Sequence, residues 1–187
     1  MMTFVNMDSA GITILPTHRV VFGLNDFSPA AFIELARKYF EIQPVNAEDP
    51  VQLTRLLARQ PGSAFIAATQ LGYHLLCAKP EVVAQALSKL PERQRRLDLA
   101  QLHSLVLEQL LGITPEAIRE QKNLRYVRDA SEATEQVARG QADVAFLTNP
   151  ITLGQLREVA FAGDVMPQKS TDFYPKLLSG LAIYALD

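Results

Sequence analysis

Cysteine is nearly absent from this chain, and tryptophan is missing altogether. The single cysteine, Cys77, among 187 residues excludes an intrachain disulfide, so packing and hydrogen bonds must hold the fold. Cys77 lies in the apolar run 73–78, which favours a buried and unreactive thiol. A chain without disulfides is typical of a reducing compartment, and we expect a cytoplasmic protein.

The chain also lacks a strong charge of either sign and a long apolar run. Its formal net charge is -2 and its pI is about 5.9, which gives no electrostatic attraction to nucleic acid or an anionic membrane. The dense basic cluster at 93–96 is followed by Asp98 and is typical of a solvated turn. No segment reaches the roughly 20 apolar residues of a membrane span, and no basic leader precedes the first apolar residues. We therefore expect neither a nucleic-acid nor a membrane partner.

Three histidines are too few and too far apart for a helix-based metal motif. His18, His74 and His103 are separated by long stretches, so their spacing predicts no metal site. The pattern around His74 predicts a strand, and that around His103 a helix, which makes both structural residues. A Gly-rich phosphate loop is absent as well, and no cofactor is indicated by any motif.

Regular hydrophobic patterns fill most of the chain. A length of 187 residues with 48% hydrophobic composition predicts one compact domain over 1–187, or two lobes joined near 89–97. Apolar, β-branched runs predict strands at 1–7, 12–15, 20–22, 42–45, 64–69, 73–78, 124–127, 144–147 and 177–186. Capped, helical periodicity predicts helices that begin near residues 29, 50, 80, 98, 115, 130 and 153.

The order of these elements indicates the fold class. Strands pair in the first half, whereas strands and helices interleave in the second half. This order predicts an α/β or α+β fold, with a mixed β-sheet and helices packed on it. The strand pattern at 1–7 starts at the first residue, which is unusual because most domains begin with a few disordered residues. We interpret it as a sign that this chain is part of a longer protein, although an ordinary edge strand would give the same pattern.

The first candidate site is the run Thr17-His18-Arg19 between two strand patterns. Histidine is suited to proton transfer near neutral pH, which makes His18 the candidate catalytic residue. Arginine offers a fork for phosphate or carboxylate. Strand alternation places Thr17 and Arg19 on one face and His18 on the other. The alternative is a surface strand with an incidental histidine.

The second candidate site lies near the C-terminus. Two ammonium groups and two hydroxyls, those of Lys169, Ser170, Thr171 and Lys176, stand close together and could hold an oxyanion such as phosphate. The alternative is a structured loop that neighbouring prolines stiffen and aromatic residues anchor to the core. Asn149 is a third candidate, because it follows a buried strand at the kind of end where α/β sheets place ligands.

Several blocks along the chain resemble the bacterial and archaeal family called domain of unknown function 1015. The highest similarity is at MPQKST, residues 166–171, with FYPKL at 173–177 and SGL at 179–181. Further blocks lie at 14–19, which reads ILPTHR, and at 97–98, 102–103, 107–113, 126–129, 145–147 and 149–150. Together they follow the order of the family over nearly the whole chain.

The resemblance implies that part of the protein is missing here. Members of the family are about twice this length, and their N-terminal half carries an Asp-Gly-His-His-Arg run similar to that of nucleotide-using phosphotransferases. This run is absent from the chain, which therefore resembles the C-terminal half. Asp172 departs from the family pattern, which has a bulky residue there, and its negative charge weakens the interpretation of the second site as a phosphate cradle.

Three functions are compatible with the sequence. The first is a substrate-binding or regulatory half of a split enzyme, acting on a small anionic or phosphorylated metabolite and inactive alone. Its partner would be an N-terminal domain or a second copy of the chain. The second is a self-sufficient phosphoester or phosphotransfer enzyme, with His18 as acid or base and Arg19 and Lys169 holding the anion. The third is an interaction module without a small ligand.

Overall fold

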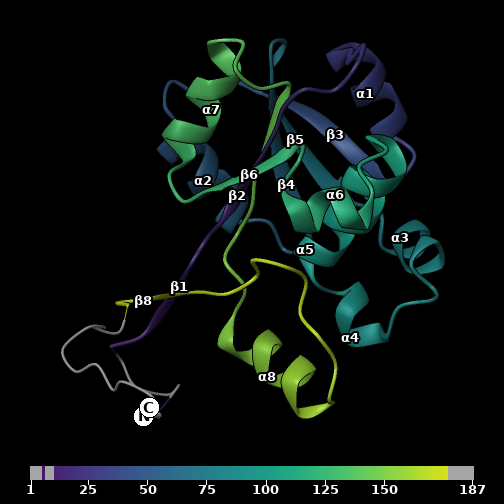
Figure 1. The fold of residues 1–187 in the computed structure, drawn as a ribbon, viewed down its shortest axis with the longest axis vertical. Coiled ribbons are helices and arrows are strands. Elements are labelled where there is room, and N and C mark those ends of the chain that lie inside the picture. The colour runs from purple at the N-terminus through teal and green to yellow at the C-terminus, as the bar shows by residue number, and fades with distance from the viewer. Residues whose placement is uncertain (1–5, 7–10, 177–187) are drawn as a thin grey trace, which may run out of the picture.

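A six-stranded antiparallel sheet with helices on both faces forms the centre of the structure (Figure 1). The computed structural model describes residue 6 and residues 11–176, so the strands expected at 1–7 and 177–186 lie outside the described residues. The strand order is β3-β5-β4-β7-β2-β6. The bounds are β2 His18–Val21, β3 Phe40–Val45, β4 Ala64–Thr69, β5 Gly72–Ala78, β6 Leu124–Val127 and β7 Val144–Leu147.

Helices connect these strands and begin at the residues that the capping signals predict. Ser28, Asp49, Thr114, Asp129 and Thr152 each accept a first-turn amide hydrogen bond with their side chain, which satisfies a backbone donor that the helix leaves free. The bounds are α1 Pro29–Ala36, α2 Pro50–Ala58, α3 Pro80–Ala86, α4 Glu92–Arg95, α5 Asp98–Gln101, α6 Pro115–Glu120, α7 Ala130–Ala138 and α8 Leu153–Phe161. The polar stretch near 89–97, expected to be a boundary or connection, contains α4.

The expected α/β class is confirmed, with one difference in the sheet. Every strand pair among the described residues is antiparallel, whereas a mixed sheet was expected. The difference arises because β7 inserts between β4 and β2, which are distant in sequence, and runs opposite to both. Interleaved strands and helices therefore do not give parallel neighbours here.

The two faces of the sheet carry separate hydrophobic cores. On one face, α2 and α7 pack against Val20, Ala145 and Leu147. On the other face, α1, α3, α6 and the helix after α5 cover Val21 and Phe146. Because side chains alternate along a strand, His18 faces the first core together with Val20, and Arg19 faces the second core together with Val21.

The longest helical segment changes its hydrogen-bonding pattern along its length. It begins as α5 and continues as the π-helix η1, Leu102–Leu110, followed by Gly112 at a φ of +68°. The sequence predicts this helix and its glycine stop, but a period of 3.6 residues cannot reveal the wider π turns. Segments of π-helix are uncommon and occur frequently at functional sites.

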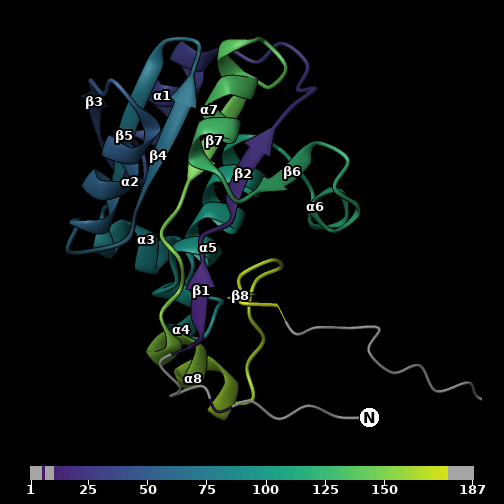
Figure 2. The same cartoon turned by 90° about the vertical axis from the view of Figure 1, so that its left-hand side faces the viewer.

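A smaller unit lies beyond the end of the sheet (Figures 1 and 2). It consists of the two-stranded ribbon β1, Thr13–Leu15, and β8, Asp172–Tyr174, together with α8. Ile14, Leu99 and Ile151 form its core, and Val159 of α8 packs with Leu97 and Ala100. These contacts fix α8 against α4 and α5. None of the helices in the described part of the chain is long and apolar enough to cross a bilayer.

Candidate functional site

The two sequence segments with candidate site residues meet at one end of the sheet. There β2 begins at His18, while β6 and β7 end at Val127 and Leu147. The segment 167–171 runs across this end, and Arg19 is hydrogen-bonded to it. The backbone oxygens of Gln168 and Lys169 accept from Arg19 Nη2 at 3.3 and 3.2 Å. Residues 150 positions apart are therefore joined directly.

Arg19 is buried, and its guanidinium is hydrogen-bonded to backbone carbonyls of the protein. Its side chain is 0% exposed, and its Nη1 donates to the carbonyl oxygen of Thr17. Its guanidinium lies 5.3 Å from the centre of the Tyr126 ring. Burial lowers its pKa to about 10, so it stays protonated at neutral pH. In this state Arg19 ties the segment 168–169 to the sheet.

His18 lies on the opposite face of β2 and is also buried. The backbone amide of Thr148 donates to His18 Nδ1 at 3.3 Å, which leaves the proton of the neutral ring on Nε2. Burial, followed by the charge of Arg19, lowers the pKa of His18 to about 4, against a smaller opposing effect of Asp129. The residue is 1% exposed, and it does not share a face with Arg19. A joint role of the two on one ligand remains a prediction that this arrangement does not favour.

The second predicted group is mainly tied up in local contacts. Ser170 is buried and donates to the carbonyl of Pro167, and Lys176 pairs with Asp172, which also pairs with Arg128. Burial would raise the pKa of Asp172, but hydrogen bonds from Lys176 and Arg128 lower it. Lys169 and Thr171 are exposed. The added charge of Asp172 thus neutralises the cation that the phosphate hypothesis needed.

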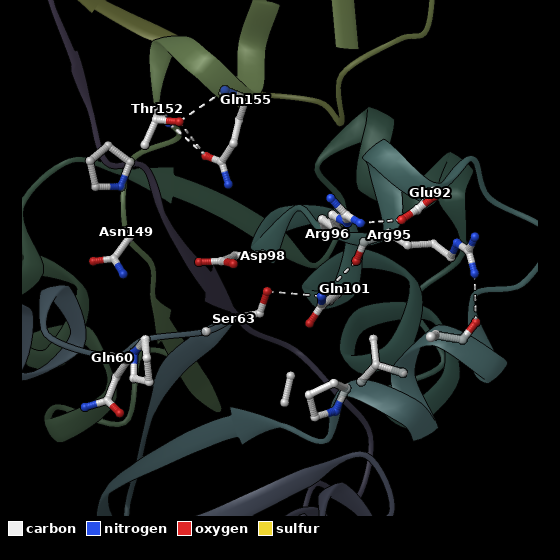
Figure 3. A pocket seen from close by; sticks show the side chains of 17 residues that line it. Gln60, Ser63, Glu92, Arg95, Arg96, Asp98, Gln101, Asn149, Thr152 and Gln155 are labelled. Atoms are coloured by element: carbon white, nitrogen blue, oxygen red, sulfur yellow. Dashed lines mark hydrogen bonds and ion pairs between the residues drawn. The ribbon is translucent and has the colours of Figure 1, made fainter. Parts of the chain in front are cut away.

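Asn149 lines a cavity formed by described residues (Figure 3). The cavity measures about 760 Å³ and lies between α3, α4 and α5, the loop before β4, and the start of α8. Asn149 reaches one wall and donates from Nδ2 to the carbonyl of Leu57 at 3.2 Å. Its neighbour Thr148 donates from its backbone amide to His18, so adjacent residues of one segment contact His18 and line the cavity.

A carboxylate, a hydroxyl and an amide meet on the cavity floor. Ser63 hydrogen-bonds Asp98, and Gln101 Nε2 donates to Ser63 Oγ at 3.1 Å and to the carbonyl of Arg95 at 2.8 Å. Burial raises the pKa of Asp98, while its hydrogen bond to Ser63 opposes the change. Figure 3 shows Asp98 between Asn149 and the Ser63–Gln101 pair. The buried Oε1 of Gln101 has no partner among the described residues, so this group has capacity for a ligand.

The upper wall is the start of α8. Thr152 and Gln155 form a capping box, with Thr152 Oγ1 accepting from the amide of Gln155 at 3.1 Å and Gln155 Oε1 from that of Thr152 at 2.9 Å. The box leaves the first-turn amides of Leu153 and Gly154 outside its hydrogen bonds. On the opposite side, Arg96 pairs with Glu92 at the rim. The cavity therefore offers both anion- and cation-binding groups.

Sequence reasoning missed most of this cavity. Ser63, Asp98 and Gln101 are far from the predicted segments, and each has an ordinary local explanation as a loop or helix-start residue. One signal was available in the helix that starts at Asp98. Gln101 precedes Leu105 by one helical turn, so it lies on the buried face, where a polar side chain needs a partner. The described residues contain no cluster of three or more His, Cys, Asp or Glu able to hold a metal.

Solved structures with a similar fold come from longer proteins. A free serine kinase in complex with AMP has a TM-score of 0.51 and 17% sequence identity, over 90% of this chain and 56% of that chain. A mutant of a free serine kinase in complex with ADP has a TM-score of 0.50 and 16% identity, over 91% and 57%. This chain thus spans little more than half the length of these structures. No curated protein matches the sequence.

One family model matches more than half of the chain. It is described as a protein of unknown function (DUF1015), and the match covers residues 1–100. These residues include the Thr17-His18-Arg19 run, the strands β1 to β5 and the floor residues Ser63 and Asp98. The chain belongs to the DUF1015 family.

Proposed function

We propose that this chain is the substrate-binding half of an enzyme that acts on a small anionic or phosphorylated metabolite. The metabolite occupies the cavity between α3–α5 and α8. The observation that carries this proposal is the convergence of Ser63, Asp98 and Asn149, from three distant parts of the chain, on one cavity. Its volume of about 760 Å³ is in the range of small-molecule sites.

The groups in the cavity suit a ligand with both a donor and an anionic part. Asp98 accepts a hydrogen bond from a hydroxyl or ammonium group of the ligand, beside Ser63. The N-terminus of α8, with its partial positive charge, and the guanidinium of Arg96 suit an anionic group. In phosphoryl transfer an aspartate can accept the proton of the attacking hydroxyl, and a raised pKa suits Asp98 to such a role.

The fold comparison supports the class of reaction. The solved structures with this fold include free serine kinase with AMP or ADP, and we extend phosphoryl transfer to this chain on that basis. We further propose that the reaction needs groups supplied by another domain or subunit, because the chain spans 56% of that structure. A self-sufficient enzyme that uses His18 is less favoured, since His18 is buried and its Nδ1 is already occupied.

A ligand screen by thermal unfolding tests the proposal. The panel contains AMP, ADP, inorganic phosphate and phosphoserine, each at millimolar concentration. A compound present at 100 times its Kd adds about 2.7 kcal/mol to the free energy of unfolding, which raises Tm by about 5 to 10 °C in a chain of this size. We expect at least one compound to stabilise the protein.

Two variants connect any stabilisation to the cavity. Asp98→Asn and Asn149→Ala should reduce the Tm increase by more than half, because each removes a polar contact to the ligand. Glu158→Gln, a change on the exposed side of α8, should leave it intact. Stabilisation that is equal in all three variants would place the ligand elsewhere, and no stabilisation by any compound would contradict a binding site in this half.

A further inference from the structure

Arg19 is a buried cation without a carboxylate partner among the described residues. Its side chain is 0% exposed, and none of the ion pairs between described residues includes it. With a pKa of about 10, the guanidinium is charged at neutral pH despite its burial. A buried charge without a counter-charge is strongly unfavourable in proteins. Its environment must therefore contribute negative charge or strong acceptors.

The hydrogen bonds of Arg19 meet this need only in part. A guanidinium has five N–H donors, and three backbone carbonyls, those of Thr17, Gln168 and Lys169, accept from its two terminal nitrogens. Carbonyl dipoles stabilise the cation but carry no net charge. Nε of Arg19 is buried and has no partner among the described residues. At least two of the five donors thus lack a carbonyl partner, and the one on Nε lies in the interior.

Two further unpartnered polar atoms belong to residues next to Arg19. Tyr126 on β6 places its ring 5.3 Å from the guanidinium, and its buried hydroxyl has no partner among the described residues. His103 on η1 interacts electrostatically with Arg19, and its buried Nε2 is unpartnered as well. Burial, then Arg19, lowers the pKa of His103 to about 3, so the ring is neutral. The Tyr126 hydroxyl adds a donor, and His103 adds another in the tautomer that carries its proton on Nε2, but neither adds negative charge.

We propose that Arg19, His103 and Tyr126 form a buried binding site for a small monovalent inorganic anion, with chloride as its representative. The three residues come from β2, η1 and β6, and they lie in the layer between the sheet and the π-helix. An anion accepts hydrogen bonds from all three donors and also neutralises the guanidinium. Water would satisfy donors but leave the charge unbalanced. A small anion is required because Arg19 is wholly enclosed.

This site is independent of the cavity around Asp98. None of its three residues lines that cavity. The segment 168–169 closes the site over Arg19 through its two carbonyl contacts. Lys169 adopts a left-handed φ of +54° in this segment, a conformation that non-glycine residues adopt infrequently. The site therefore links anion binding to the position of the loop that carries Lys169.

Halide titration and crystallography with bromide test the proposal. The free energy of unfolding is measured in sodium chloride and in sodium gluconate at equal ionic strength, so that general salt effects cancel. We expect saturable stabilisation by chloride and bromide and none by gluconate, which is too large to enter. Crystals grown in bromide should show an anomalous peak within hydrogen-bonding distance of Arg19 Nε. Water at this position instead of bromide would refute the proposal.

Variants separate the site from nonspecific halide effects. Arg19→Met should abolish the halide dependence, and Arg125→Met, which changes an exposed arginine of the neighbouring strand, should retain it. If Arg19→Met does not fold, Tyr126→Phe provides the test, because it removes one donor and keeps the ring. We expect the half-saturating halide concentration of Tyr126→Phe to rise at least threefold. An unchanged halide dependence in Tyr126→Phe and Arg19→Met would contradict the site.

Discussion

At the scale of one residue, the surroundings of Asp98 have two opposing effects on its ionised carboxylate. As the first residue of α5 it places a negative charge at a helix N-terminus, which is favourable. Its partial burial nevertheless raises its pKa, so the net effect of folding is to disfavour the ionised form. An acid whose pKa rises on folding is a cost to stability at neutral pH, and such a cost is typical of residues retained for function.

The stability of Asp98→Asn tests this reasoning. Between the unfolded pKa near 3.8 and the raised folded value, the folded state binds more protons, so the wild type gains stability as pH falls. The variant lacks this titration. At pH 7 we expect the variant to match or exceed the wild type in free energy of unfolding, with the difference vanishing below pH 4. Urea unfolding at a series of pH values measures it. A variant that is clearly less stable at pH 7 would show that the carboxylate is structural.

At the residue scale, the sequence singled out Thr17-His18-Arg19 and Lys169 as candidates, but not the residues on the cavity floor. The second candidate function places Arg19 and Lys169 on one anion, and in the structure Arg19 donates to the backbone carbonyl of Lys169. The cavity residues escaped because Ser63 and Asp98 lie 35 positions apart and meet only through the packing of α5 on the start of β4. No local pattern reports such a contact. Among the three residues on the cavity floor, only Gln101, a polar side chain on an apolar face, carried a signal.

At the scale of single elements, α8 depends on its cap more than on its own propensity. The helix has nine residues, and Val159 is its only buried side chain. Short helices are marginal without capping and tertiary contacts. The capping box of Thr152 and Gln155 satisfies two backbone donors, and these residues also line the cavity. The capping box therefore stabilises the first turn of α8 and, with it, the wall of the cavity.

The substitution Thr152→Ala is therefore expected to destabilise the first turn of α8 and the cavity wall that it forms. Loss of an N-cap side chain costs about 1 kcal/mol. The free energy of unfolding should fall by that amount, and amide exchange at residues 153–156 should accelerate. Thr171→Ala, a change at an exposed threonine outside any helix, is the matched control and should have little effect. Equal exchange rates in both variants would mean that packing on α4 and α5, rather than the cap, fixes the start of α8.

The elements themselves were largely readable from the sequence. Serine, threonine and aspartate ahead of proline or an apolar period marked helix starts, because capping is local chemistry. Strands such as 124–127 and 144–147 were predicted with the bounds that the structure shows. The π-helical pattern of η1 was not predictable, since its hydrogen bonds depend on packing around Leu102, His103 and Leu105 rather than on local preference.

At the scale of the whole molecule, topology was the part that sequence could not provide. The interleaved order of strands and helices favoured parallel pairs, yet the pairing of β7 with both β2 and β4 makes the described sheet antiparallel. This pairing brings the start of β2 to the same end as the exits of β6 and β7. The position of β7 in the sheet therefore determines which polar residues lie close together at this end. Two buried histidines, His18 and His103, lie on opposite faces of the sheet as a consequence.

These histidines predict the acid limit of the protein. Folding lowers the pKa of His18 to about 4 and that of His103 to about 3, from 6.5. Below pH 6.5 the unfolded chain therefore binds more protons than the folded chain, and stability falls with pH. For His18 alone the loss in free energy of unfolding approaches about 3 kcal/mol by pH 4.

We expect His18→Gln, which keeps an acceptor for the amide of Thr148, to flatten the pH dependence of the free energy of unfolding between pH 6.5 and 4. His74→Gln, at a partly buried position, should flatten it less. Asp98 acts in the opposite direction over the lower part of this range, so Asp98→Asn should steepen the same curve. A curve that is flat in the wild type would mean that water or a conformational change reaches His18 before the protein unfolds.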